Sequence, residues 1–157
     1  MAHLSLDEVL AWLSAEVTGL TTAFAQATIL TGLSIERSLI ILIHRIEWFV
    51  PAVHGGDGNV AAQITRTSQT AILTVNNPLV VAPYINHMDF TTSGQIFKEM
   101  PKGEIYVVPI PIASPALYFG VTPSATPTPD SARVRIGYTV KSVAEKDFFK
   151  LAAAITL

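Results

Sequence analysis

Three groups of polar residues could do chemistry, and each of them contains a histidine. His87 and Asp89 lie two positions apart in the segment INHMDF, so a strand would place both side chains on one face. Such a pair could bind a metal ion or act as base and acid, but two ligands do not make a site. His44 and Glu47 form an H-x-x-E pattern, yet residues three apart on a strand face opposite sides. We favour ordinary surface polarity for the first pair and discount the second.

The third group lies in the Gly-rich segment HGGDGN, whose His54, Asp57 and Asn59 could bind a cation or a phosphate. The segment matches neither the Walker nor the Rossmann glycine pattern, and its ligands are too few for an EF-hand. We interpret it as a turn, in which Gly supplies positive φ and Asp and Asn form local hydrogen bonds. The chain also has no cysteine and no G-x-S-x-G nucleophile elbow. We therefore expect no enzyme activity, catalytic residue, metal or cofactor.

Half of the 157 residues are hydrophobic and only 14% are charged, which is low for a soluble protein. Part of the apolar surface is therefore expected to be buried against other chains. The net charge of −2 argues against a dedicated nucleic-acid binder. A modest basic stripe contains Arg133, Arg135, Lys141, Lys146 and Lys150. We favour a solvated strand face or an inter-subunit salt-bridge surface for this stripe over nucleic-acid contact.

Two uncharged segments are long enough to be candidates for membrane spans. Residues 17–35 carry five threonines and are too polar for a lipid-facing helix. Residues 105–129 contain six prolines and cannot form one helix. Residues 1–16 lack the basic start of a signal peptide and contain three acidic residues. We expect neither a signal peptide nor a transmembrane helix.

The segment LIILIHRIEWFV at 39–50 is predicted as a strand, because a helix would scatter its charges around the circumference. Strict alternation puts one set of side chains on one face: Leu42, His44, Ile46, Trp48 and Val50. The other face then carries Ile41, Ile43, Arg45, Glu47 and Phe49. Arg45 and Glu47 share this second face, so they can pair with each other or with neighbouring strands.

The segment ARVRIGYTVK at 132–141 alternates most clearly. Its predicted inward residues are Val134, Ile136, Tyr138 and Val140, and its predicted outward residues are Arg133, Arg135, Thr139 and Lys141. Further strands are predicted at 21–31, 59–67, 70–76, 79–90, 103–112 and 115–122. About eight short strands at this spacing predict an all-β fold, a jelly-roll-like β-sandwich with a short helix at each end.

Both terminal helices are predicted from capping boxes. Ser5 to Glu8 begins the first, which continues with leucines at helical spacing to near Gly19. Ser142 to Glu145 begins the second. The first helix is too short to be stable alone. We therefore expect residues 1–20 to form an arm that packs on a neighbouring subunit or an underlying layer, and residues 21–157 to form the sandwich domain.

The order of these elements resembles that of the small single jelly-roll coat proteins of icosahedral viruses and phages. The likeness covers most of the chain at pattern level: the arm, a Thr/Ala-rich strand, IHRIEWFV, the Pro-rich loop TPSATPTPD, and ARVRIGYTVKSVAEKDFF at the end. It implies a structural subunit of a self-assembling capsid, located in the virion, whose partners are copies of itself and other virion proteins. Many coat proteins of RNA viruses have a basic N-terminal arm, whereas residues 1–36 here contain neither Lys nor Arg. Contact with DNA or an internal membrane is therefore expected only through assembly.

The expected inter-subunit contacts combine the apolar face of the arm with the charged strand faces. They are Leu6, Leu10, Leu13, Arg45, Glu47, Arg133 and Arg135. Two other classes stay open. A carbohydrate-binding or adhesin-type sandwich would expose aromatic residues, for which Tyr84, Tyr106 and Tyr118 are the candidates. A cupin-like enzyme would instead need its histidines to converge with a carboxylate.

Overall fold

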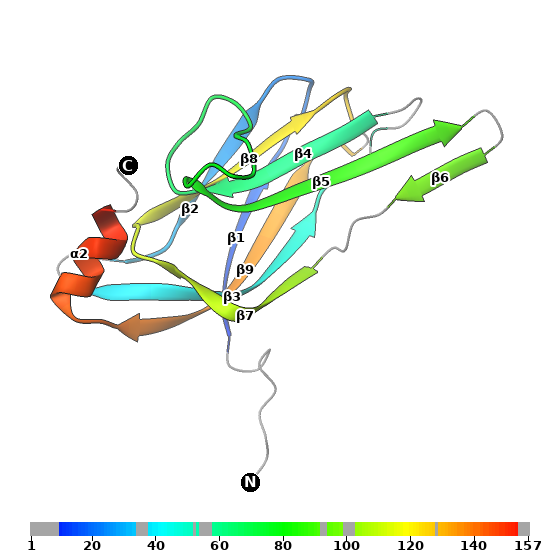
Figure 1. Cartoon of the computed structure of the whole chain (residues 1–157). Coiled ribbons are helices and arrows are strands. Elements are labelled where there is room, and N and C mark those ends of the chain that lie inside the picture. Colours follow the sequence, from blue (N-terminus) through cyan, green and yellow to red (C-terminus); the bar gives the residue numbers. More distant parts are fainter. Residues whose placement is uncertain are drawn as a thin grey trace, which may run out of the picture.

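The computed structural model describes residues 10–33, 38–51, 53, 58–91, 94–98, 103–127 and 129–153, with the backbone alone at 86–91 and 94–98. These residues form two antiparallel sheets packed on each other, with a helix at one end (Figure 1). Sheet A contains, in spatial order, β1 (Ala11–Val17), β9 (Ala132–Ser142), β3 (Leu39–Phe49) and β7 (Gly103–Ile112). Sheet B contains β2 (Ala25–Leu30), β8 (Ala116–Pro123), β4 (Gly58–Thr65), β5 (Val80–Thr91) and β6 (Gly94–Lys98). Helix α2 (Glu145–Ala153) follows β9.

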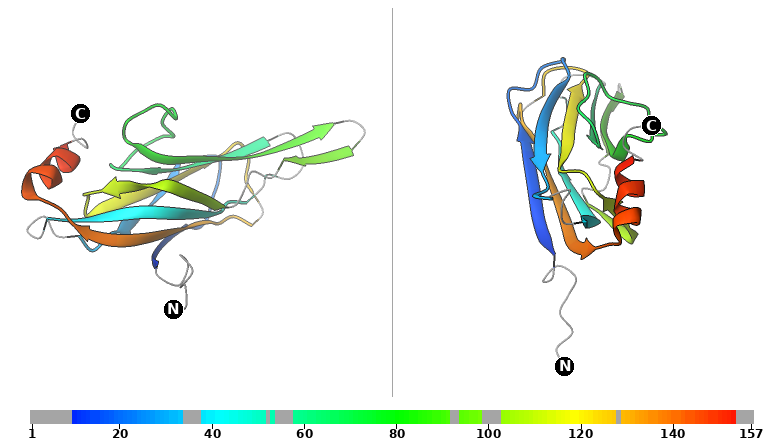
Figure 2. Two further views of the ribbon diagram at one scale, coloured as in Figure 1. Left: turned by 60° about the horizontal axis from the view of Figure 1, so that its bottom comes forward. Right: turned by 90° about the vertical axis from the view of Figure 1, so that its left-hand side faces the viewer.

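The strand order is that of a jelly roll. The first half of the chain pairs with the second half in nested order, β1 with β9, β2 with β8, β3 with β7 and β4 with β5. Successive pairs alternate between the two sheets, which wraps the paired chain into a sandwich. Strands β5 and β6 form a hairpin that projects at the end opposite α2 (Figure 2). The all-β, jelly-roll-like sandwich predicted from the sequence is confirmed.

The core between the sheets is organised around Trp48. The side chain of Trp48, from sheet A, stacks on Tyr84 of sheet B at 5.3 Å between ring centroids and lies 6.2 Å from Phe119. All three side chains are buried. Tyr84, a candidate exposed aromatic of a binding module, is therefore a core residue.

Strand β3 is confirmed, but its strict alternation is wrong. Ile43 pairs with Tyr138 whereas Arg45 pairs with Gly137, so His44 is an extra residue in a β-bulge. The bulge puts Ile46 and Trp48 on the same face as Ile41 and Ile43, whereas strict alternation had placed these two pairs on opposite faces. The core-facing residues of β3 are Ile41, Ile43, Ile46 and Trp48.

Strand β9 keeps its predicted alternation in its first half. Val134 and Ile136 are fully buried, as expected. Val140 was predicted to face inward but is more than half exposed, because the pairing of β1 with β9 ends at Tyr138 and leaves one side of Val140 uncovered.

The predicted N-terminal helix is wrong over residues 11–17, which form strand β1. β1 pairs along its whole length with β9, and its residues Leu13, Ala15 and Val17 pack into the core. The segment also alternates in polarity, and the free edge of β9 offers hydrogen bonds that outweigh its helical spacing. The capping box at Ser5 and the beginning of the predicted helix lie outside the described residues.

The other strand predictions are confirmed except at 70–76, which lies in a loop, and β6 was not predicted. The 66–79 loop covers one end of the outer face of sheet B (Figure 1). It is held by two side-chain amides of that face. Gln63 Oε1 accepts a hydrogen bond from the Leu73 N–H at 3.1 Å, and Gln26 Oε1 accepts one from the Gln69 N–H at 2.9 Å. These bonds satisfy backbone groups of a segment without a strand partner.

The C-terminal helix predicted from its capping box is confirmed as α2. Its Phe148 is buried against Ile40 of β3 and Ala113, which follows β7. Because Ile41 faces the core, Ile40 faces outward, and α2 therefore covers one end of the outer face of sheet A. No helix among the described residues is long and apolar enough to cross a membrane.

Candidate functional site on the open face of sheet A

The two sheets differ in how their outer faces are covered. Part of sheet B lies under the 66–79 loop, and one end of sheet A lies under α2. The rest of the outer face of sheet A, beyond the His44 bulge, carries the main polar cluster of the described chain. We call it the open face; it consists of Trp12, Ser14, Glu16, Arg133, Arg135, Gly137, Arg45, Glu47, Phe49, Gly103 and Ile105.

The strand register arranges the open face in three rows across the sheet, each read from β1 toward β7. Row 1 is Glu16, Arg133 and Phe49. Row 2 is Ser14, Arg135, Glu47 and Gly103. Row 3 is Trp12, Gly137, Arg45 and Ile105. Side chains directly opposite each other on neighbouring strands are close enough to interact.

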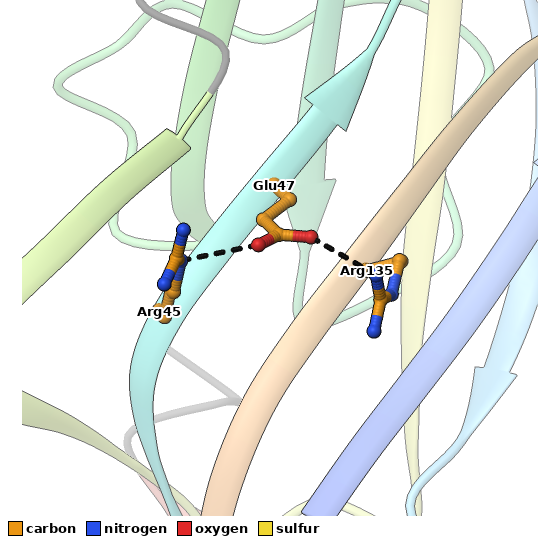
Figure 3. A network of polar contacts seen from close by, with 3 residues as sticks. All are labelled: Arg45, Glu47 and Arg135. Atoms are coloured by element: carbon orange, nitrogen blue, oxygen red, sulfur yellow. Dashed lines mark ion pairs between the residues drawn. The ribbon is translucent and has the colours of Figure 1, made fainter. Parts of the chain in front are cut away.

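Glu47 is the centre of the polar contacts on this face (Figure 3). Its Oε1 lies 3.2 Å from Arg45 Nε, and its Oε2 lies 3.3 Å from Arg135 Nη1. The predicted pairing of Arg45 and Glu47 on one face is therefore confirmed, with Arg135 as a second partner. The Glu47 side chain is 18% exposed, so the carboxylate is partly removed from water. That partial burial favours the network over a fully exposed pair.

Two arginines of β9 lie over aromatic rings of the neighbouring strands. The guanidinium carbon of Arg133 is 4.6 Å from the centroid of the Phe49 ring, and that of Arg135 is 4.5 Å from the Trp12 ring. These distances are those of cation–π contacts. Each ring therefore has one face occupied by a guanidinium, and the two arginines are held in position before any ligand arrives.

Gly137 allows Trp12 to lie across the sheet. A Cβ atom at Gly137 would come within 3.1 Å of the Trp12 ring and 2.8 Å of a Leu10 methyl group. Leu10 is itself buried. Leu10 and Leu13, which the sequence suggested as contacts with a neighbouring subunit, thus pack within this chain, and Leu6 lies outside the described residues.

Two shallow hollows flank Phe49 on the open face. The larger, of about 350 Å³, is lined by Glu16, Phe49, Val50, Pro51, Pro129, Ser131 and Arg133. The smaller, of about 260 Å³, is lined by Arg45, Glu47, Phe49 and Gly103. Both combine apolar walls with at least one charge of each sign, so they suit an amphipathic side chain of a partner.

The edge strand β7 borders the open face and carries a second bulge. Ile110 pairs with Ile43 and Ile105 pairs with Arg45, so four residues of β7 lie opposite His44 alone. Two of them, Val107 and Val108, are 96% and 79% exposed, and Ile105 is 66% exposed. We call these three residues the β7 apolar edge.

Inside the same bulge, Tyr106 points toward the core. Its hydroxyl donates a hydrogen bond to Glu104 Oε2 at 2.5 Å. Partial burial, together with the hydrogen bond to Glu104 and its negative charge, raises the pKa of Tyr106 well above its usual value. Tyr106 therefore anchors the bulge from its inner side.

The structure does not gather the residues first considered for chemistry. His44 Nε2 lies 2.8 Å from Thr139 Oγ1, whereas the Glu47 carboxylate contacts Arg45 and Arg135. Asn59 lies in β4, where its N–H donates to Ser124 Oγ at 2.9 Å. The side chains of His87 and Asp89, and all of His54 and Asp57, lie outside the description. Among the described residues, no group of three or more His, Cys, Asp or Glu could hold a metal ion.

The basic stripe is divided in the structure. Arg133 and Arg135 belong to the open face, whereas Lys141 is exposed toward the end of β9, beyond the bulge. Sequence reasoning placed Phe49 on the face of Arg45 and Glu47, as the structure does, but missed Trp12 and Ile105 as part of the same surface. The signal for β1 was in the sequence: Trp12, Ser14 and Glu16 alternate with the apolar Leu13, Ala15 and Val17, which is the pattern of a strand with one buried face.

No protein-family model matches this sequence, and no curated protein is similar enough to count as a relative.

Proposed function

We propose that this chain is a structural subunit of a self-assembling shell, a coat protein of a viral capsid that resides in the virion. The observation that carries the proposal is the β7 apolar edge. Three large aliphatic side chains are exposed side by side on an edge strand, one of them almost completely. An apolar edge of this kind is a site of association with another chain.

The shape of β7 favours a closed assembly over a fibre. Pro109 and Pro111 have no N–H to donate, and the bulge at 106–109 interrupts the edge. A neighbouring strand cannot add to β7 along its length, so contact is made by the side chains of the bulge. Side-chain contacts between different patches on identical subunits generate rings about a symmetry axis where the rotation between subunits closes, which is the geometry this proposal requires.

The fold agrees with this proposal without deciding it. Jelly rolls are found in viral capsid proteins, lectins and cupins, and function depends on the site that each carries. The described surface of this chain offers apolar and ion-paired contacts, which suit the polar rim and apolar centre of a protein interface. The partners are therefore copies of this chain, joined in a virion by other structural proteins.

Negative-stain electron microscopy and analytical sedimentation of concentrated protein test the proposal. We expect closed particles, or capsomers with five- or six-fold symmetry. A monodisperse monomer at high concentration and moderate salt would contradict it.

That outcome would favour a second candidate, a β-sandwich binding module of the carbohydrate-binding or adhesin type. The hollow of about 350 Å³ beside Phe49 supports this candidate. Against it, Arg133 already occupies one face of the Phe49 ring, so a sugar would have to displace the guanidinium to stack there. Glycan binding by the monomer, lost on a Phe49→Ala substitution, would identify this alternative.

A further inference from the structure

We propose that two copies of this chain pair face to face through the open face of sheet A, about a two-fold axis that runs parallel to the strands between β9 and β3. The inference deepens the proposed function and rests on it in one respect, namely that the partner is a second copy. It specifies which surface pairs and in which orientation.

The central row supplies the charge complementarity. A two-fold axis along the strands brings β9 of one copy over β3 of its partner while keeping each row opposite itself. In row 2, Arg135 then lies opposite the partner's Glu47, and Glu47 lies opposite the partner's Arg135. Opposite charges therefore meet twice across the interface.

The flanking rows are complementary under the same operation. In row 1, Arg133 lies opposite the partner's Phe49, repeating between the copies the cation–π contact found within each of them. In row 3, Trp12 lies opposite the partner's Ile105, which pairs two apolar side chains. Ser14 lies opposite the partner's Gly103, so two small residues meet at the border of row 2.

Charge excludes the other simple orientation. A two-fold axis perpendicular to the strands, along row 2, would place Arg135 opposite the partner's Arg135 and Glu47 opposite the partner's Glu47. Like charges in contact are unfavourable and are used by proteins to suppress wrong pairings. An isologous contact about the strand-parallel axis has no such conflict.

The charged side chains of the open face are also preorganised for binding a second copy. Arg133 and Arg135 are held over aromatic rings, so they lose less side-chain freedom when a partner binds. An arginine carries five N–H donors, which lets Arg135 serve its own Glu47 and the partner's Glu47 together. Three arginines and two glutamates leave the face nearly neutral, so it fits a copy of itself better than a strongly acidic or basic ligand.

The test uses two charge reversals, Arg135→Glu and Glu47→Arg, with light scattering after size exclusion. We expect the wild type to dimerise and each variant alone to dimerise more than about tenfold more weakly, because both central contacts become like-charged. An equimolar mixture should recover dimers that contain one copy of each variant. In such a dimer one central contact joins the two introduced side chains, which have opposite charges, and the other joins the native Arg135 to the native Glu47.

Each substitution also breaks an ion pair within its own chain, and mixing the variants cannot restore that pair. Recovery of dimers in the mixture would therefore show that the lost contact is between chains. Lys141→Glu is the matched control: it reverses a charge on β9 beyond the bulge and should leave dimerisation unchanged. The proposal is overturned if the single variants, folded by circular dichroism, dimerise like the wild type. It is equally overturned if the folded variants stay monomeric when mixed.

A cross-linking experiment covers the case in which a charge reversal prevents folding. The chain has no cysteine, so a Ser14→Cys and Gly103→Cys double variant carries the only two thiols. A Cβ at Gly103 would meet no atom closer than 3.9 Å, so the substitution fits. Facing sheets lie about 10 Å apart, and a bismaleimide of that span should yield covalent dimers from the double variant but not from either single one. Absence of dimers from the double variant overturns the pairing.

These outcomes are independent of those for the shell. Dimers without closed particles would support this pairing and contradict the coat-protein proposal. Particles that still form from both charge-reversal variants, with unchanged dimerisation, would contradict this pairing alone.

Discussion

At the scale of single residues, Glu47 forms ion pairs with two arginines, Arg45 on its own strand and Arg135 on β9. Replacing it with Gln keeps the size of the side chain and removes the charge that both guanidinium groups contact. We expect Glu47→Gln to lower the free energy of unfolding by about 1 kcal/mol at low salt, since partly exposed pairs contribute about 0.2–1 kcal/mol each. The difference should shrink at high salt, where exposed charges are screened. Urea unfolding at two salt concentrations measures it.

The matched control is Asp130→Asn, which neutralises an exposed carboxylate outside the network. It should change the free energy of unfolding by less than about 0.5 kcal/mol. If the two variants behave alike, the network contributes nothing to stability.

Tyr106 gives a pH-dependent prediction. Its pKa is raised in the folded state, so the folded protein holds the phenolic proton more tightly than the unfolded chain does. The resulting stability is fully present below about pH 10, the pKa of an unperturbed Tyr, and is lost as the pH rises further. Tyr106→Phe should be less stable than the wild type at pH 7 by about 1–2 kcal/mol, because the hydrogen bond to Glu104 is lost.

Above pH 10 the wild type should lose stability relative to Tyr106→Phe. The difference between their free energies of unfolding should therefore narrow, by at most about 1.4 kcal/mol per pH unit. Chemical denaturation between pH 7 and the onset of alkaline unfolding measures this change. Val75→Ser, which removes no titratable group, is the control, and its free energy of unfolding should differ from that of the wild type by a constant amount over this pH range. A constant difference for Tyr106→Phe would mean that the phenol is not held in its protonated form by the fold.

At the scale of elements, β1 decides how the chain begins its fold. Removing residues 2–18 deletes Leu13 and Val17 from the core and exposes the edge of β9. We expect the free energy of unfolding to fall by more than about 4 kcal/mol, since one buried Leu truncation alone costs about 2–5 kcal/mol. Thermal unfolding followed by circular dichroism measures the loss.

Removing residues 2–9 is the matched control, because it keeps all nine described strands. This shorter deletion should unfold cooperatively near the wild-type temperature. A stable sandwich after deletion of residues 2–18 would show that β1 is dispensable, as expected of an arm that serves a neighbouring subunit.

At the scale of the whole molecule, substitutions in the β7 apolar edge should impair assembly without changing the stability of the folded chain. Val107 and Val108 are both mostly exposed, so replacing both with Ser should change the free energy of unfolding by less than about 1 kcal/mol. The same double substitution should abolish particles or capsomers if this edge contacts another copy. Sedimentation velocity and urea unfolding, run on the same samples, measure the two effects.

Val75→Ser is the control for this experiment, because Val75 is also exposed but lies in the 66–79 loop over sheet B. It should leave assembly unchanged. Assembly that survives the Val107 and Val108 substitutions would move the proposed contact away from β7.

The sequence by itself determined the strands whose polarity pattern is local. β9 is predicted because its polarity alternates, and β3 because a helix would scatter its charges around the circumference. Arg45 and Glu47 pair because they are two positions apart on the part of β3 that follows the bulge. The capping box before α2 is equally local. Such features require no knowledge of what lies next to the segment.

Only the tertiary structure decided the features that depend on a distant partner. Residues 11–17 form a strand because β9, more than a hundred residues later, offers them an edge. The bulge at His44 arises from fitting β3 to β7 and β9 at once, and it reverses the faces of every later residue in the strand. The open face exists for the same reason: its rows are set by cross-strand register, which is a relation between segments and cannot be read from any one of them.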